Sequence, residues 1–199
     1  MLAPKKQRGF TLIESIVAIV VLGFALMIMT GMLFPQWQQS AQPHYQARAS
    51  ALAETLLNEI LARQYDQNSD PDGGIVRCDQ SPSLEFPTPP TCSSTLGPDV
   101  GEARFALTDV DDYIGCWADS ARECNGSPWR GRLSDILGES IADDYNQFVV
   151  DVSVIYDSNF DARADNPTIK ANRLFKRVEL EVKTQHWGEY QYAAYKGNY

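Results

Sequence analysis

Glu14 is a lone carboxylate near the start of a long apolar segment, residues 10–34. A charged side chain at the centre of a membrane helix costs about 2.5–3.5 kcal/mol, but one turn from the helix start it can reach the headgroups. Inside a packed bundle of apolar helices, an unpaired carboxylate is costly unless it meets a cation. Taken alone, Glu14 is therefore typical of an interfacial glutamate, and only the residues that precede it, Gly9 to Ile13, favour charge pairing instead. The other clearly polar residues of the segment are Thr11, Ser15 and Thr30.

Two acidic clusters farther along the chain have residue types that bind hard cations. They are Asp109, Asp111 and Asp112 in the first, and Asp157, Asn159 and Asp161 in the second. The second imitates the start of a calcium loop but lacks its glycine and its terminal glutamate. Because Asp and Asn also close turns with their own side chains, turn chemistry explains both clusters without an ion. We therefore assign no metal and no cofactor.

The four cysteines, Cys78, Cys92, Cys116 and Cys124, allow three pairings. Their spacing favours Cys78–Cys92 and Cys116–Cys124, two local loops. In the chain-entropy model, loops of this size stabilise a fold by roughly 2.5–3 kcal/mol each. No spacing is of the CxxC type and no histidine lies nearby, so disulfides in an oxidising compartment are favoured over metal ligation.

No catalytic constellation stands out in the sequence. The two histidines, His44 and His186, belong to no recognisable nucleophile, zinc or phosphate motif. The formal net charge of −9 argues against nucleic-acid binding, which needs a basic surface. We therefore expect neither an enzyme nor a nucleic-acid-binding protein.

The apolar segment that carries Glu14 is long enough to cross a membrane. As an α-helix, residues 10–34 would span roughly 37 Å, against about 30 Å for a hydrocarbon core. A signal peptide has a shorter apolar region of about 7–15 residues, so the segment is interpreted as an anchor. Lys5, Lys6 and Arg8 precede it, and the next basic residue is Arg48. This bias places the amino terminus in the cytoplasm and the chain after about residue 35 outside.

The stretch from Lys5 to Glu14, followed by the apolar helix, resembles the prepilin leader of the type IV pilin family. The resemblance implies that prepilin peptidase cuts between Gly9 and Phe10 and that the new amine of Phe10 is methylated. It also implies that Glu14 pairs with this amine, on a neighbouring subunit or within its own. The expected partners are the peptidase, other pilins and the inner-membrane pilus assembly machinery.

This resemblance and the sequence pattern together predict an α+β fold in four parts. Residues 1–9 form the leader peptide, 10–34 the transmembrane and assembly helix, 35–66 its amphipathic continuation and 67–199 an extracytoplasmic head. The chain is expected to sit in the inner membrane, with a single pass and a periplasmic head, and then to leave with an extracellular pilus. Removing the leader takes away three basic residues, so the formal charge falls from −9 to about −12.

Within the head, a striped helix is expected to pack on a small antiparallel meander. The stripe falls at helical spacing and consists of Ala49, Leu52, Ala53, Leu56, Leu57, Ile60 and Leu61. Pro35 and Pro43 are expected to kink or loosen the helix before it. Alternation predicts strands over 148–156, 174–184 and 190–195, with a turn at Trp187 to Glu189. A loop-rich, disulfide-bearing insertion over 67–147 is expected to hold a strand over 104–110 and a short helix around Leu133, Ile136, Leu137 and Ile141.

Finer resemblances point to the minor pilins of mannose-sensitive haemagglutinin (MSHA) type IV pili. They rest on the leader, on Asp109 to Tyr113, and on the segments 176–182 and 192–199. This implies a minor pilin that acts in pilus biogenesis, filament priming or at the tip. Two alternatives remain: a minor pseudopilin of a type II secretion system, and a pilin-borne adhesin head. The adhesin alternative depends on Trp117 and Trp129 being exposed rather than packed beneath the disulfide loops.

Overall fold

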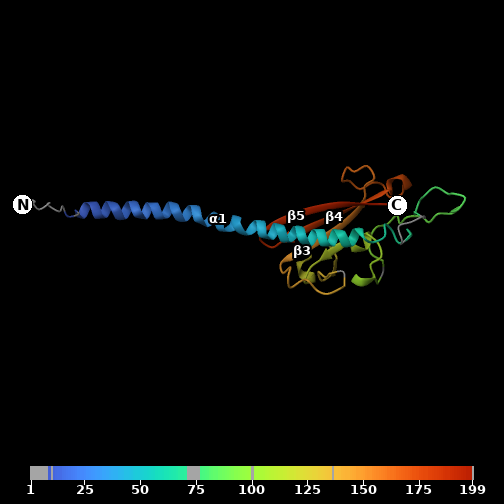
Figure 1. The fold of residues 1–199 in the computed structure, drawn as a ribbon, viewed down its shortest axis with the longest axis horizontal. Helices are drawn as coiled ribbons and strands as arrows, with labels where there is room; N and C mark the ends of the chain where they lie inside the picture. Colours follow the sequence, from blue (N-terminus) through green and yellow to red (C-terminus); the bar gives the residue numbers. More distant parts are fainter. Residues whose placement is uncertain (1–8, 10, 71–76, 100, 136, 199) are drawn as a thin grey trace, which may run out of the picture. The chain divides into compact units, whose positions relative to one another are not determined.

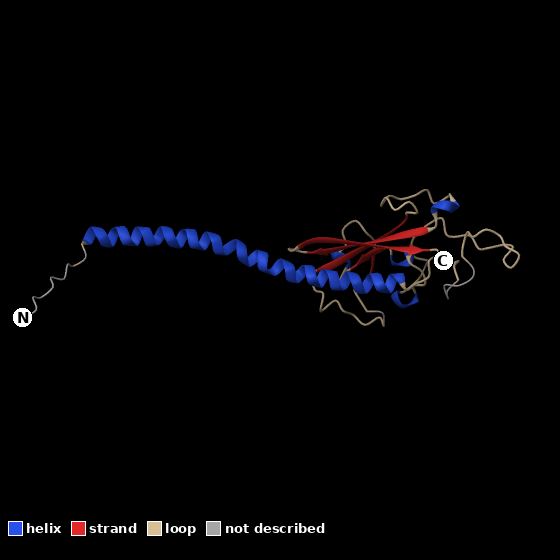
Figure 2. Ribbon diagram, turned by 45° about the horizontal axis from the view of Figure 1, so that its top comes forward, coloured by secondary structure: helices blue, strands red, loops and turns tan. Residues whose placement is uncertain are grey.

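The computed structural model describes residues 9, 11–70, 77–99, 101–135 and 137–198, and the chain divides into two units, residues 1–44 and 45–199. Figure 1 labels helix α1 and strands β3, β4 and β5 on a ribbon coloured by residue number, and Figure 2 colours the same ribbon by secondary structure. The second unit combines helix and a largely antiparallel sheet, which confirms the predicted α+β class.

Helix α1 comprises Leu12–Leu61 and includes Pro35 and Pro43, so the polar stretch between these prolines is helical as well. The kink expected there stays a prediction. In the second unit the apolar stripe is buried as expected, although Leu57 and Leu61 are only half-buried. Its fully buried members, Ala49, Leu52, Ala53, Leu56 and Ile60, are at most 5% exposed.

The sheet has the strand order β2-β1-β3-β4-β5. The predicted meander is present as β3 (Phe148–Tyr156), β4 (Phe175–Thr184) and β5 (Gly188–Gly197), which pair antiparallel. Two short strands extend it that the sequence did not predict, β1 (Gly115–Trp117) beside β3 and β2 (Trp129–Gly131) parallel to β1. The turn between β4 and β5 occupies residues 185–187, slightly earlier than expected.

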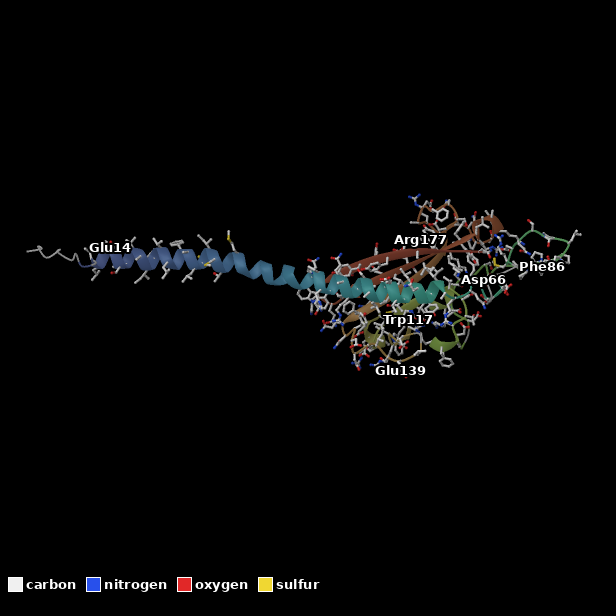
Figure 3. The ribbon with its side chains drawn as sticks, viewed as in Figure 1. Glu14, Asp66, Phe86, Trp117, Glu139 and Arg177 are labelled. Carbon is white, nitrogen blue, oxygen red and sulfur yellow. A yellow bond between two sulfur atoms is a disulfide. The ribbon has the colours of Figure 1, made fainter. Side chains whose placement is uncertain are left out.

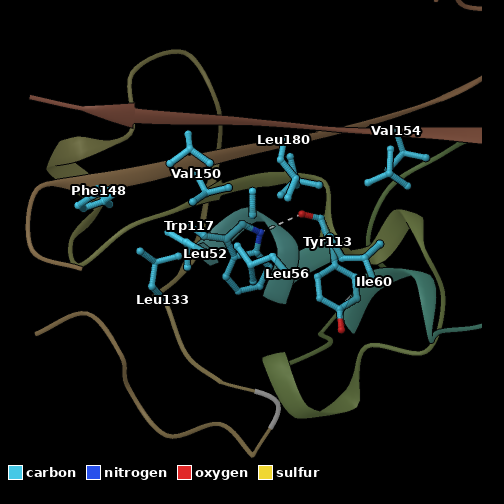
Figure 4. Packing of buried hydrophobic residues seen from close by; sticks show 14 of the residues in the cluster. Leu52, Leu56, Ile60, Tyr113, Trp117, Leu133, Phe148, Val150, Val154 and Leu180 are labelled. Carbon is cyan, nitrogen blue, oxygen red and sulfur yellow. Dashed lines mark hydrogen bonds between the residues drawn. The ribbon is translucent and has the colours of Figure 1, made fainter. Parts of the chain in front are cut away.

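The core lies between the helical stripe and one face of the sheet (Figure 4). Strands β3 and β4 alternate, so that Val150 is paired with Val182 and Val154 with Val178, and all four side chains are buried. Beyond β3, Tyr113 and Trp117 complete the core, and the Trp117 indole N–H donates to the Tyr113 carbonyl at 2.9 Å. The opposite sheet face carries charged residues, including Arg177 and Glu179 on β4.

Residues 104–110 do not form the predicted strand. Arg104–Ala106 is a 3₁₀ turn (η1), and a second 3₁₀ turn (η2, Asp111–Tyr113) follows. The N–H groups of Thr108 and Asp109 donate to Oδ2 of Asp112 at 2.8 and 2.9 Å. Because one carboxylate holds both donors, the segment turns instead of offering them to a strand ladder.

The short helix predicted within 133–141 is also absent from the described part of that range, and Ile136 lies outside the described residues. Oδ1 of Asp135 accepts the N–H groups of Leu137 and Glu139, both at 2.9 Å. The apolar spacing suggested helical periodicity, but this side chain closes a local turn in its place.

Candidate functional site

The amino-terminal candidate site is the first turn of α1. The N–H of Glu14 donates to the Thr11 carbonyl at 3.1 Å and to Thr11 Oγ1 at 3.4 Å, so Thr11 caps the helix. Glu14 lies in the first turn, where the helix dipole favours a negative charge (Figure 3). Gly9 is exposed, whereas Phe10, the expected site of methylation, lies outside the described residues.

Glu14 borders an apolar helix surface, and no ion pair joins it to another described residue. The surface near it is lined by Ile13, Val17, Ala18, Val21, Leu22 and Ala25. Among the residues that the structure describes, one helix segment is long and apolar enough to cross a membrane: Leu12–Met32, with a mean hydropathy of 2.6 and no buried residues. Length and composition therefore fit membrane anchoring, with the carboxylate near one end of the span.

Two disulfides close loops in the irregular part of the head. They join Cys78 to Cys92, with Cα atoms 4.9 Å apart, and Cys116 to Cys124, with Cα atoms 5.8 Å apart. These are the two pairs that the spacing favoured. Asp66 lies near the first pair, but both sulfurs are bonded to each other, so neither is a thiolate that could bind a metal.

A buried ionic cluster, which we call the Lys176 cluster, consists of Lys176, Asp66, Asp109 and Asp111. All four residues are at most 1% exposed. The Lys176 ammonium donates to Oδ1 of Asp111 and lies 3.6 Å from Oδ2 of Asp66. It also donates to the Tyr65 carbonyl at 2.5 Å. The first acidic group predicted from the sequence is thus partnered by a lysine and by backbone amides.

Asp109 has an unusual protonation equilibrium within this cluster. Burial, followed by the charge of Asp111, raises the pKa of the Asp109 carboxyl to about 8. Its carboxylate oxygens accept the N–H groups of Asp111 at 3.0 Å and of Gln67 at 2.8 Å, so it also organises the turn. Three buried carboxylates share one lysine, which favours a retained proton on one of them.

Replacing Asp109 with asparagine is expected to flatten the pH dependence of head stability. In the wild type the folded-state pKa of about 8 lies above the ordinary 3.8. The protonated Asp109 carboxyl therefore makes its full contribution to the free energy of unfolding below about pH 4. This contribution is lost as the pH rises toward 8, with a limiting slope of about 1.4 kcal/mol per pH unit. Between pH 5 and 8, the wild type should lose roughly 3–4 kcal/mol more than Asp109→Asn. Urea unfolding of both proteins across this range measures the difference, and parallel pH profiles would contradict it.

The second acidic cluster is also a turn. Oδ1 and Oδ2 of Asp157 accept the N–H groups of Asp161 and Ala162 at 3.0 and 2.9 Å, and the Tyr195 hydroxyl donates to Oδ2 at 2.7 Å. Although burial opposes it, the hydrogen bonds from Tyr195 and the backbone lower the pKa of Asp157. These contacts account for the acidic spacing without an ion.

The two tryptophans considered for surface binding have different environments. Trp117 is buried in the core at 4% exposure, as packing beneath the loops would require (Figure 4). Trp129 on β2 is 44% exposed, and its indole N–H donates to the Ala118 carbonyl at 3.4 Å.

Sequence reasoning missed a second buried ionic group, centred on Glu59 of α1. Arg104 binds both carboxylate oxygens of Glu59, at 2.6 Å for Nη2 and Oε2. The Tyr113 hydroxyl donates to Oε1 of Glu59 at 2.8 Å. Glu59 lies three residues after Leu56 and one before Ile60, so its position on the apolar stripe was the available signal.

Comparison with known proteins finds one family, described as the prokaryotic N-terminal methylation motif, over residues 4–30. No curated protein and no solved structure matches the chain. The matched residues include Gly9, Phe10 and Glu14 and most of the Leu12–Met32 segment. The chain therefore carries the prokaryotic N-terminal methylation motif, which indicates a type IV pilin-like or pseudopilin-like protein.

Proposed function

We propose that this chain is a minor pilin subunit of an MSHA-type type IV pilus. The observation that carries the proposal is the methylation motif over residues 4–30, which overlaps a capped, membrane-length helix with Glu14 in its first turn. Prepilin peptidase removes residues 1–9 and the amine of Phe10 is methylated. Residues 10–34 hold the subunit in the inner membrane, with the head of residues 67–199 in the periplasm, until it joins other pilins.

The amine and the carboxylate supply the assembly chemistry. Cleavage before Phe10 creates a cation four residues from Glu14, and a neighbouring subunit or the same chain can satisfy that carboxylate with it. In an apolar helix bundle, such a pair removes the cost of two separate buried charges and fixes the axial register of adjacent helices. The function is therefore assembly, with no reaction required of the head.

We place this chain among the minor pilins because it resembles the MSHA minor pilin MshD. The segments that resemble it, Asp109 to Tyr113 and 176–182, meet in the folded head, where Asp111 binds Lys176. The loop-rich region with two disulfides makes the head larger and more elaborate than a subunit of the filament shaft requires. This supports a position in priming or at the tip.

Two alternatives share the same anchor. A minor pseudopilin of a type II secretion system would have neighbouring genes for a secretin and secreted enzymes, whereas a pilus subunit would have those for a pilus ATPase and a major pilin. A pilin-borne adhesin head is supported by the exposed indole of Trp129.

Mass spectrometry of the mature chain tests the proposal. In cells with active prepilin peptidase, the chain should begin at Phe10 with a methylated amine, and in cells without the enzyme it should keep residues 1–9. A side chain at Gly9 would meet no other described atom within 4 Å, so substitutions there are not expected to disturb the fold. Gly9→Val should block cleavage at least tenfold because the peptidase needs a small residue, while Gly9→Ala serves as the matched small control. A mature terminus other than Phe10 would refute the proposal.

A further inference from the structure

Lys176 and Asp111 are held together in a part of the head that excludes water. Lys176 comes from β4 and is 0% exposed, and Asp111 comes from η2 and is 1% exposed. Nζ of Lys176 is in hydrogen-bond contact with Oδ1 of Asp111. Because Oδ1 is bonded to Cγ, the carboxyl carbon is the next atom beyond the oxygen that the nitrogen contacts. The rings of Tyr65 and Tyr156 cover the nitrogen, with centroids at 4.6 and 5.6 Å.

The charges of this pair are costly where they lie. Removing an ammonium and a carboxylate from water carries a penalty of several kcal/mol per ion that their mutual attraction repays only in part. The same site holds two further buried carboxyl groups, Asp66 and Asp109, and even with Asp109 protonated the negative charge exceeds the positive charge. A neutral link between Lys176 and Asp111 would remove two of these charges and keep both residues in place.

We propose that Lys176 and Asp111 condense within the folded head to form an intramolecular isopeptide bond. The new bond joins Nζ of Lys176 to Cγ of Asp111, and the Cγ–Oδ1 bond breaks. An ammonium and a carboxylate become one amide and one water, so neither an oxidant nor an activating co-reactant is needed.

The neighbouring groups can move the protons that this step requires. The Lys176 ammonium gives a proton to Asp66, whose Oδ2 lies 3.6 Å from Nζ. Asp109, which retains its proton near neutral pH, protonates Oδ1 of Asp111, and the amine then attacks Cγ. The nitrogen returns a proton to Asp109, and Asp66 supplies the second proton with which Oδ1 leaves as water. Both acids end as they began.

Two further features favour the reaction. The N–H of Gly97 donates to Oδ2 of Asp111 at 3.0 Å, and so holds the oxygen that stays on the amide and carries the transient negative charge. The fold fixes the two reacting groups side by side, which replaces a costly bimolecular encounter. The link would join η2 to β4, two elements that lie far apart in the sequence. Formation of the link does not depend on filament assembly.

Intact-mass spectrometry of the mature full-length chain, denatured and with its cysteines reduced and alkylated, tests the proposal. The wild type should be lighter than the linear chain by one water. Proteolysis should release a branched peptide that joins the fragment containing Lys176 to the fragment containing Asp111. A wild-type mass equal to that of the linear chain would overturn the proposal, whatever the variants show.

Two variants locate the water loss. Lys176→Arg keeps the charge but cannot form this amide, so it should have the linear mass. Water loss that persists in it would place the dehydration elsewhere, for example at Asp72-Gly73, and would overturn the proposal. Asp109→Asn keeps both reacting groups but removes the acid that protonates Oδ1. When the intact mass of the folded variant is followed over time, most chains should keep the linear mass. Linkage as complete and as fast as in the wild type would refute the role of Asp109.

Discussion

Replacing Glu14 with alanine is expected to leave membrane insertion intact and to lower incorporation into filaments at least tenfold. The substitution makes the Leu12–Met32 segment more apolar, so the segment should still insert. In an assembled bundle, however, the methylated amine that we propose for Phe10 would lose its proposed partner carboxylate. Breaking a buried ion pair costs about 3–5 kcal/mol, and about 1.4 kcal/mol already corresponds to a factor of ten. Immunoblots of membrane and sheared-filament fractions measure both effects.

Ser15→Ala is the matched control for this variant. Ser15 is the adjacent polar residue, and its hydroxyl donates to the Thr11 carbonyl at 3.4 Å. Its replacement should leave both fractions unchanged. Normal incorporation of the Glu14→Ala chain would contradict the pairing, and loss of the chain from the membrane would show that Glu14 acts in insertion instead.

Much of the fold was predictable because its strongest signals are periodic. The stripe from Ala49 to Ile60 buries one face of the helix, and the alternation in β3 and β4 buries one face of the sheet. In the strands, a shift by one residue would move the whole apolar set to the other face. The local disulfides were predictable for a related reason, since cysteines 8 and 14 residues apart close short loops. Strands β1 and β2 were missed because three residues are too few to show a period.

The buried charges were harder to predict because a charged residue is usually exposed. Lys176 occupies the inward position that precedes Val178 and Leu180 in the alternation of β4, so its burial could be inferred from the pattern. Its partners could not be inferred, because Asp66 and Asp111 lie on irregular segments brought to β4 by the tertiary fold. Turn chemistry explained the acidic spacing around Asp111, and nothing in that spacing indicated that Asp111 contacts a buried lysine.

Replacing Glu59 with alanine is expected to destabilise the head by about 3 kcal/mol, because it leaves the Arg104 guanidinium without a carboxylate. The Glu59 side chain is 4% exposed and that of Arg104 is 15% exposed, so water can replace the lost partner only in part. The Tyr113 hydroxyl loses its acceptor as well. Chemical denaturation of the mature chain, monitored by tryptophan fluorescence, measures the loss.

Glu54→Ala provides the matched control, because Glu54 is an exposed glutamate of the same helix. Its replacement should change the free energy of unfolding by no more than about 0.5 kcal/mol. The double variant Glu59→Ala/Arg104→Ala separates the two causes of destabilisation. If the unpaired guanidinium dominates, the double variant should be more stable than Glu59→Ala alone, because it removes the stranded charge. If the losses in unfolding free energy of the two single variants instead add up to that of the double variant, the ion pair does not stabilise the contact between η1 and α1. In that case the packing of the aliphatic parts of the two side chains stabilises it.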